Sequence, residues 1–577
     1  MATLTGNTIA STYALLLKID STGIAGDGTL RKVEDGDATD SALSLSDVSI
    51  AVDATDKIFL DGGTHSYIHE SASDVVQIVA GGTVVFEGDT NSRISLSNND
   101  SGTDNTVFGE SAGNLIASGD NYNTFIGHEV ADADMTNATY NTAVGYQALS
   151  AMTTPADFNT AIGAKALTAF TTGLGYNNAL GYQAGLALQT GWGNVFLGTN
   201  AGKGTTLVDK AICIGYGAGQ GVMTAGADES IIIGYVAGGA ITSATGNTVV
   251  GSEALKEHTT GGNNTVIGYH AADGTQAGGT QVTSAGSTDN IFIGVDTGGG
   301  SWADAASNYN VAIGNYAMDS ALAAVNQSVA VGYGALGSVT QGDYNTCIGY
   351  YAGTAIQTGQ RNIAIGALAY DDAAGDTQDN IAIGYAALGN LNHNSSIRNI
   401  GLGQYAGDGM GTLAGSIDNI FIGYDAGGGT WTTAVSTFNV AIGNYALDAA
   451  MNGAVNNTAV GYDAMSDLID GGQNTCIGKS AGNKITAGDH NIIIGDSAGA
   501  NDINLTTGDS NILIGNYADV STADAQNQIA IGYNVSCTAN STITVGDVAN
   551  TASLGLDGSD TSWAAASSDE RYKENIE

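Results

Sequence analysis

A short apolar phrase that ends in glycine returns along most of the chain. Its glycine recurs in 25 copies between positions 109 and 546, at nearly even intervals such as 109, 127, 145, 163 and 181. Regular spacing of this kind is the signature of a solenoid, in which each unit buries its apolar face only by stacking on its neighbours. Clear copies are NTAVG at 141–145, NTAIG at 159–163, NVAIG at 310–314 and 439–443, and NTCIG at 345–349 and 474–478.

Two columns of the phrase predict the core. The residue before the glycine is large and apolar, and the residue three before it is usually Thr, Val or Ile. These two side chains point the same way on a strand, where β-branched residues are favoured. The glycine then turns the chain, so each copy reads as strand, glycine corner, short second strand and polar loop. The residues expected in the repeat core include Ile162, Ile313, Ile348, Ile442 and Ile477.

The column two before the glycine points the opposite way and is also apolar, for example at Ala143, Phe196 and Ala441. A single solenoid would expose it as a continuous stripe, which soluble proteins rarely tolerate. We therefore expect copies of the chain to close over it as a homotrimer, intertwined or side by side, with three-fold symmetry taken as the conventional solution for fibres. The predicted fold is all-β, a fibrous, repetitive parallel β-roll or β-solenoid of about 25 coils.

Asparagine stands four residues before the glycine in 20 of the 25 copies. Stacked coils would place these amides about 4.8 Å apart, close enough for each to hydrogen-bond to the next. We expect a structural ladder rather than a ligand site. Its members include Asn123, Asn141, Asn159, Asn290 and Asn419.

The repeat also divides the chain into regions. Residues 105–550 carry the array, within which 286–370 matches 415–499 without a gap. Residues 1–104 lack the phrase and are expected to form a β-rich attachment region with hairpins around the Gly-Gly pairs at 62–63 and 81–82. Residues 551–577 are expected to be a C-terminal linker that leads into a distinct motif.

Composition narrows the functions. The net charge is −42, which argues against nucleic-acid binding because phosphate contacts need Lys and Arg. No run of 18 apolar residues and no secretory signal is visible, so we expect no membrane insertion. We expect no metal site and no cofactor, although divalent cations could screen the charge. Cys213, Cys347 and Cys476 share one repeat position and are interpreted as buried small hydrophobes.

The last residues, SSDERYKENIE at 567–577, resemble the opening of the endosialidase-type intramolecular chaperone, a self-cleaving module that trimerises phage tail fibres and tailspikes. Ser568 and Lys573 match the serine and lysine that the family uses for self-cleavage, where the lysine activates the serine hydroxyl. The sequence stops within the first residues of that module. The repeat of 105–550 is similar to repeats upstream of this chaperone and to head repeats of trimeric autotransporter adhesins, whose coils are shorter.

The resemblance implies a virion tail fibre, assembled in the host cytoplasm and acting outside the cell. Its expected partners are further copies of itself, a virion attachment protein at the N-terminal region, and a host surface glycan or protein receptor. It would not be an enzyme, and one-time self-cleavage is expected only if the full gene encodes the rest of the chaperone module. Candidate contact regions are the long loop 270–288 and the tyrosines that follow the glycine in 11 copies, which alternatively wedge between coils.

Three alternatives stay open. The chain could be a cellular surface adhesin or extracellular filament subunit. It could be a glycan-degrading tailspike, although no pair of carboxylates stands out as such a site would require. The third and most remote alternative is ice binding by a flat threonine array.

Overall fold

A computed structural model describes residues 104–558 except 154–155, 275–285, 301–305, 373–375, 392, 394, 412–414, 432–433 and 557, together with Ser66, Gly102 and the strands outside that range. The chain divides into two compact units, Met1–Gln183 with Gln189–Trp192, and Ala184–Leu188 with Gly193–Glu577. The described residues are almost all in strands and turns. Their helical content is two single turns of 3-10 helix, η1 (Ala225–Ala227) and η2 (Asp408–Met410).

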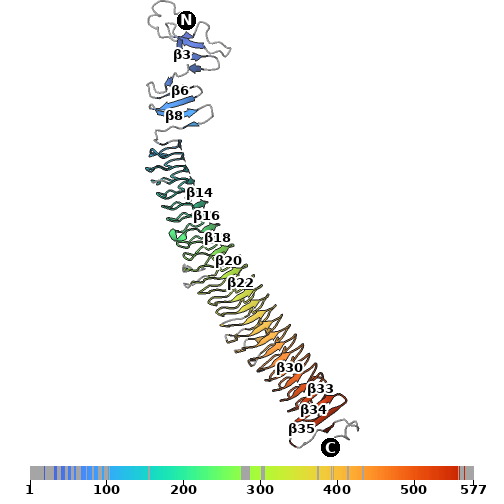
Figure 1. Cartoon of the computed structure of the whole chain (residues 1–577). Helices are drawn as coiled ribbons and strands as arrows, with labels where there is room; N and C mark the ends of the chain where they lie inside the picture. Colours follow the sequence, from blue (N-terminus) through green and yellow to red (C-terminus); the bar gives the residue numbers. More distant parts are fainter. Residues whose placement is uncertain are drawn as a thin grey trace, which may run out of the picture. The chain divides into compact units, whose positions relative to one another are not determined.

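The first unit contains two antiparallel sheets followed by parallel strands (Figure 1). The first antiparallel sheet consists of β1 (Lys18–Ile19), β2 (Arg31–Glu34), β3 (Asp40–Leu45) and β4 (Ile50–Val52). The second consists of β5 (Lys57–Phe59), β6 (Tyr67–Ala72), β7 (Val75–Ala80), β8 (Thr83–Gly88) and β9 (Ile94–Ser95). The parallel strands are β10 (Thr106–Phe108), β11 (Thr124–Ile126), β12 (Thr142–Val144), β13 (Thr160–Ile162) and β14 (Asn178–Leu180).

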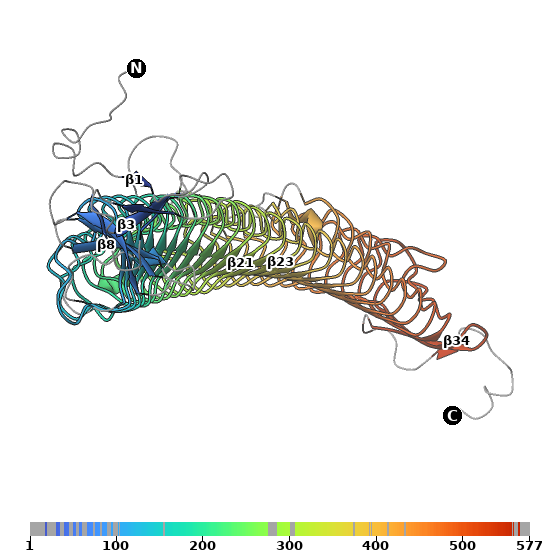
Figure 2. The same ribbon diagram turned by 90° about the horizontal axis from the view of Figure 1, so that it is seen from above.

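The second unit continues with one three-residue strand for each copy of the phrase, and each strand pairs in parallel with the next (Figure 2). These strands are β15 (Val195–Leu197), β16 (Ile212–Ile214), β17 (Ile231–Ile233), β18 (Thr248–Val250), β19 (Thr265–Ile267), β20 (Ile291–Ile293), β21 (Val311–Ile313), β22 (Val329–Val331), β23 (Thr346–Ile348), β24 (Ile363–Ile365), β25 (Ile381–Ile383), β26 (Ile400–Leu402), β27 (Ile420–Ile422), β28 (Val440–Ile442), β29 (Thr458–Val460), β30 (Thr475–Ile477), β31 (Ile492–Ile494) and β32 (Ile512–Ile514). The longer β33 (Ile529–Tyr533) and β34 (Thr542–Asp547) follow, and β35 (Thr551–Gly555) and β36 (Ala564–Ala565) then pair antiparallel.

The predicted parallel β-solenoid is confirmed, with about 23 turns. This is slightly fewer than about 25 coils, because only residues 534–541 join β33 to β34, too few for a complete coil. The predicted second strand of each copy is wrong. The residues after the glycine form turns, whose backbones hydrogen-bond from coil to coil, as where the Leu149 amide donates to the Ala166 carbonyl at 3.1 Å.

The two faces of the strand are the reverse of the prediction. The middle residue of each strand, two before the glycine, is the buried one: Ala312 is 0% exposed, whereas Ile313 beside it is 39% exposed. The five isoleucines predicted in the core, Ile162, Ile313, Ile348, Ile442 and Ile477, therefore lie on the outer face of the sheet, half-buried or exposed. The threonine column shares that outer face.

The buried column can consist of residues as small as alanine because the turn opposite the strand also contributes a side chain to the interior. Where the residue four after the glycine is large, the middle strand residue is small, as in Ala441 with Leu447, both fully buried. Where that position is glycine, the strand residue is usually larger: a Cβ on Gly427 would lie 2.6 Å from the Phe421 ring. Inner residues that face such a glycine include Phe196, Phe292, Phe421, Cys213, Cys347 and Cys476.

Some coils depart from this exchange of volume, and the coil of β26 shows how the space is then filled. Gly401, in the middle of β26, has Gly407 at the facing position of its own turn. The space is filled from the coil before, because a Cβ on Gly401 would lie 2.8 Å from Cγ of Leu388. The volume that the strand gives up is therefore taken by a neighbouring leucine rather than left empty.

The asparagine ladder is present. The Asn141 backbone amide and its side-chain Nδ2 both donate to Oδ1 of Asn123, at 2.9 and 3.2 Å, and the same Nδ2 donates to the Ala156 carbonyl at 2.9 Å. Each fully buried amide thus ties its own coil to the coils before and after it, which satisfies groups that burial would otherwise penalise. The same pattern holds at Asn159, Asn290 and Asn419.

The glycine of the phrase is required by close stacking of the corners. Gly163 has φ of +132°, and a Cβ on it would lie 2.4 Å from the carbonyl oxygen of Gly181 in the next coil. Any side chain there would push two coils apart, since their corner backbones are in direct contact. This explains why the glycine column is unbroken although the residue after it varies widely.

The hairpins expected at the two Gly-Gly pairs are present. The strands on either side of each pair are antiparallel partners, β5 with β6 and β7 with β8. At the other end of the chain, β35 covers the last edge of the solenoid by pairing antiparallel with β34. The duplicated blocks also match in structure, because β20–β24 recur as β27–β31 at equivalent positions of the two blocks.

The reciprocal packing of strand and turn predicts a compensated substitution. Phe421→Ala alone leaves a cavity and is expected to lower the free energy of unfolding by about 3–5 kcal/mol. Gly427→Leu alone places a side chain against the Phe421 ring and is also expected to destabilise. Together they recreate the Ala441–Leu447 pair of the next coil, where Leu447 already has φ of +51°. The double variant should recover part of the loss in denaturant unfolding, and additive losses would contradict the packing rule.

Candidate functional site

The outer face of the parallel sheet is a long apolar surface. It consists of the first and third residue of each strand, and we call it the outer sheet face. In the second unit the first residues are Ile, Val or Thr and the third residues are Ile, Val or Leu throughout β15–β33. With strands about 4.8 Å apart, this face runs for roughly 85 Å within that unit. Monomeric soluble proteins rarely expose apolar patches beyond a few hundred Å².

The outer sheet face also lacks charge. The chain has 57 Asp and Glu and 15 Lys and Arg, yet none of them occupies the first or third position of β10–β33. Threonines interrupt the isoleucines in places, for example Thr346 and Thr475, but they form no continuous array in the second unit. Exclusion of charge from one face of so acidic a chain is a pattern expected of a buried contact rather than of a solvated surface.

Aromatic side chains form surface columns on either side of the strands. In the first unit, Tyr122, Tyr140, Phe158 and Tyr176 stand just before the asparagine of successive copies and stack with ring centres 4.9 to 5.0 Å apart. This column is not among the predictions from the sequence, although its recurrence one residue before the asparagine could have revealed it. All four rings are exposed.

Tyrosines on the other side of the strands follow the glycine by one or two residues. In five successive coils of the second unit their rings meet edge to face, with centres 5.3 to 6.1 Å apart: Tyr385, Tyr405, Tyr424, Tyr445 and Tyr462. The rings touch their neighbours but stay partly or largely exposed, for example Tyr462 at 51%. The wedge interpretation therefore holds only in part, because these rings contact one another at the surface rather than in the interior.

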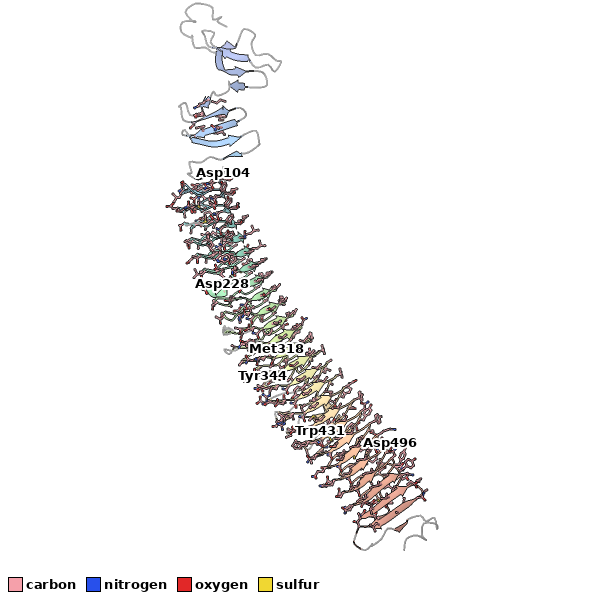
Figure 3. The ribbon with its side chains drawn as sticks, viewed as in Figure 1. Asp104, Asp228, Met318, Tyr344, Trp431 and Asp496 are labelled. Carbon is pink, nitrogen blue, oxygen red and sulfur yellow. The ribbon has the colours of Figure 1, made fainter. Side chains whose placement is uncertain are left out.

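In the first duplicated block, tyrosines at the same repeat positions line a hollow of about 260 Å³ that extends over three coils. Tyr316, Tyr333 and Tyr351 line it with Asp319, Ser338 and Thr354. The ring of Tyr333 meets Tyr316 at 5.4 Å and Tyr351 at 5.3 Å, both edge to face. A side-chain hydrogen bond with Tyr333 raises the pKa of Tyr351. In Figure 3 the labels Met318 and Tyr344 mark coils that contribute to this hollow.

The second duplicated block carries different residues at two positions of this hollow. A Cβ on Gly334 would lie 2.5 Å from the Tyr351 ring, so this tyrosine needs glycine beneath it. The equivalents of Gly334 and Tyr351 in the second block are Asp463 and Ser480, and the Ser480 hydroxyl donates to the Asp463 carboxylate at 3.2 Å. The same coils thus present a tyrosine hollow in one block and a charged surface in the other.

Half-buried carboxylates lie beside these tyrosines in both blocks. Burial, and then repulsion from Asp296 and Asp273, raises the pKa of Asp319 to about 6. Burial likewise raises the pKa of Asp448 to about 6, with repulsion from Asp425 and other nearby carboxylates. Among the residues that the structure describes, no group of three or more His, Cys, Asp or Glu is arranged to hold a metal ion.

Several predictions from the sequence meet the structure at this point. Ser568 and Lys573, the suspected self-cleavage pair, lie outside the described residues, as do residues 275–285 of the loop 270–288. Cys213, Cys347 and Cys476 are buried in the core as predicted, and burial raises the pKa of Cys213 to about 12. The hollow itself is not among the predictions, although the change of Tyr351 to Ser480 between the duplicated blocks could have indicated it.

Comparisons of this chain with protein-family models, with curated proteins and with solved structures find no match. Within the described part of the chain, no helix has the length and apolar character needed to cross a bilayer.

The raised carboxylate pKa values predict how stability depends on pH. A carboxyl group with a higher pKa in the folded chain than in the unfolded chain binds protons more tightly when folded, so its contribution makes unfolding harder as pH falls from about 7 to about 4. Asp448→Asn removes the burial and repulsion cost at neutral pH. We expect a higher melting temperature for this variant than for the parent at pH 7.5, with the difference shrinking towards pH 4. Asp524→Asn, at an exposed position, is the matched control for the loss of one carboxylate.

Proposed function

We propose that this chain is a structural subunit of a phage tail fibre, that copies of it pack through the outer sheet face as a parallel homotrimer, and that the fibre attaches the particle to the surface of a host cell. The observation that carries the proposal is the outer sheet face, long, apolar and free of charge on a chain of net charge −42. The virion assignment rests on the resemblance of residues 567–577 and of the repeat to phage fibre proteins.

Charge supports self-association through this face in particular. Like-charged chains repel one another wherever their acidic surfaces approach. On the outer sheet face that repulsion is weakest, since its columns contain only Ile, Val, Leu, Thr, Phe and Asn in β10–β33. Covering an isoleucine that is still about two-fifths exposed contributes roughly 1 kcal/mol at about 25 cal/mol per Å². Summed over the length of the face, this exceeds the usual cost of bringing chains together.

Symmetry determines how the copies are arranged. Each coil offers one flat face, so two chains could pack face to face, whereas three chains could turn their faces towards a common axis. In a parallel arrangement around an axis, each coil meets the same coil of its partners, and the irregular coils align with their own copies. The choice of three copies follows the chaperone resemblance.

A cluster of charges on the outer sheet face tests the assembly. A variant with four changes to Asp in the same chain is expected to lower the native mass from a multiple of 57.8 kDa to that of a single chain, because carboxylates cannot be desolvated against one another. The four changed residues are Ile313, Ile348, Ile442 and Ile477. The matched control changes four exposed apolar residues outside the strands to Asp, namely Leu174, Leu207, Val222 and Val435. A parent chain that is monomeric in native mass spectrometry at micromolar concentration would refute the assembly.

Attachment has its own measurement. The purified, fluorescently labelled fibre is expected to bind saturably to the cells of some strains in a bacterial panel and to compete there with phage that carry it. The four-Asp variant of the outer sheet face should bind much more weakly, since single chains lose multivalent contact. Binding that is absent from every strain that such phage infect would contradict the attachment role while leaving the assembly intact.

A further inference from the structure

The hollow of the first duplicated block is lined by side chains that the equivalent positions of the second block do not all carry. We propose that Tyr316, Tyr333, Tyr351 and Asp319 form a binding subsite for one neutral or amino-substituted pyranose unit of a surface carbohydrate. This inference rests on the proposed attachment function and gives it a location and a ligand class.

The aromatic walls fit a sugar ring. Three tyrosines from successive coils meet edge to face, so their planes are steeply inclined, at 70° and 85°, and enclose a corner rather than a flat stripe. One face of a pyranose carries mostly C–H groups and packs on an aromatic ring. Ligand sites commonly combine such apolar walls with a few polar groups that fix orientation.

Polar groups also line the hollow and can bond the hydroxyls of a sugar. Asp319 is half-buried, and Ser338 and Thr354 add hydroxyl groups. A carboxylate accepts two hydrogen bonds from neighbouring hydroxyls of one sugar or from an ammonium group. The hollow of about 260 Å³ is just below the range typical of drug-sized ligands, which suits one sugar ring rather than a folded peptide.

Charge selects among sugars. Asp296 and Asp273 act on Asp319, and the chain as a whole is strongly acidic, so a uronic or sialic acid would meet repulsion at this position. Neutral hexoses, N-acetylhexosamines and free hexosamines would not. The ligand class is therefore uncharged or cationic.

The duplicated block provides the internal comparison. Tyr445, Asp448 and Tyr462 correspond to Tyr316, Asp319 and Tyr333, but Ser480 stands in place of Tyr351 and Asp463 in place of Gly334. The second block thus keeps two of the tyrosines and the carboxylate without the third ring. The third ring and the glycine beneath it are what the first block adds, which places the specificity of the proposed subsite on Tyr351.

The test is a titration of the full chain with methyl glycosides, with binding measured by saturation-transfer NMR. The neutral and amino sugars are glucose, galactose, mannose, N-acetylglucosamine and galactosamine, and methyl glucuronide is the acidic comparison. At least one neutral or amino sugar is expected to bind one site per chain with a Kd on the order of 1 mM. Tyr351→Ser, which copies the second block, should weaken that binding at least tenfold. Tyr445→Ala, in the second block, is the matched control and should leave it unchanged.

A second variant keeps the test decisive if Tyr351→Ser lowers the melting temperature. Tyr333→Leu keeps an apolar side chain but removes the shared ring, and it should lose binding to the same extent. Absence of binding for every glycoside, equal binding of the glucuronide, or parent affinity in both folded variants would overturn the subsite. If the variants lose sugar binding yet the fibre never binds cells, the attachment function fails and the subsite stands. If cells bind equally to parent and Tyr351→Ser fibres, the subsite is not their receptor site.

Discussion

The coils of this protein depend on one steric constraint, the width between the strand and the turn that faces it. The space holds one large side chain, contributed either by the middle residue of the strand or by the residue four after the glycine. Ala441 with Leu447 and Phe421 with Gly427 are the two solutions in adjacent coils. Because interiors are close-packed, coils of constant width can stack only if the lost volume is replaced at every level, from within the coil or from a neighbour. The asparagine ladder and the glycine corners then hold neighbouring coils at a fixed separation.

The constant width of the coils also shapes the outer sheet face. When the inner column is filled from within, the first and third residues of each strand are left on a flat, regular surface. On that surface the chain places mainly Ile, Val, Leu and Thr and no charge, while carboxylates collect on the turns. In the proposed assembly, this face would direct self-association by the absence of repulsion as much as by apolar area. The tyrosine columns border the strands and are partly or largely exposed in the single chain.

Much of this was accessible from the sequence, and one error is instructive. The period and the parallel strands follow from columns that repeat without exception or nearly so, and the asparagine ladder from a column filled in 20 of 25 copies. The buried cysteines follow from the repeat position that they share. The assignment of faces is wrong because a uniform column of large apolar residues is typical of a core, which favours Ile313 over Ala312. In this solenoid the core column is the variable one, since each position adapts to its partner across the coil, as Cys347 does to Gly353. Covariation within a coil is therefore more informative than uniformity between coils. The hollow could not be predicted from the period, because it depends on the inclination of three rings from different coils.

The duplicated block also sets a unit of length. Strands β20–β24 and β27–β31 keep the same register in the two blocks, and each coil is bonded chiefly to its immediate neighbours. Seven coils separate equivalent strands, which corresponds to roughly 34 Å of axial rise. Copying or excising such a segment leaves both junction coils with the partners they already fit. The length of the solenoid can therefore change by whole blocks while its terminal coils stay the same. A new copy of the block can then diverge on its turns, as at Tyr351 and Ser480.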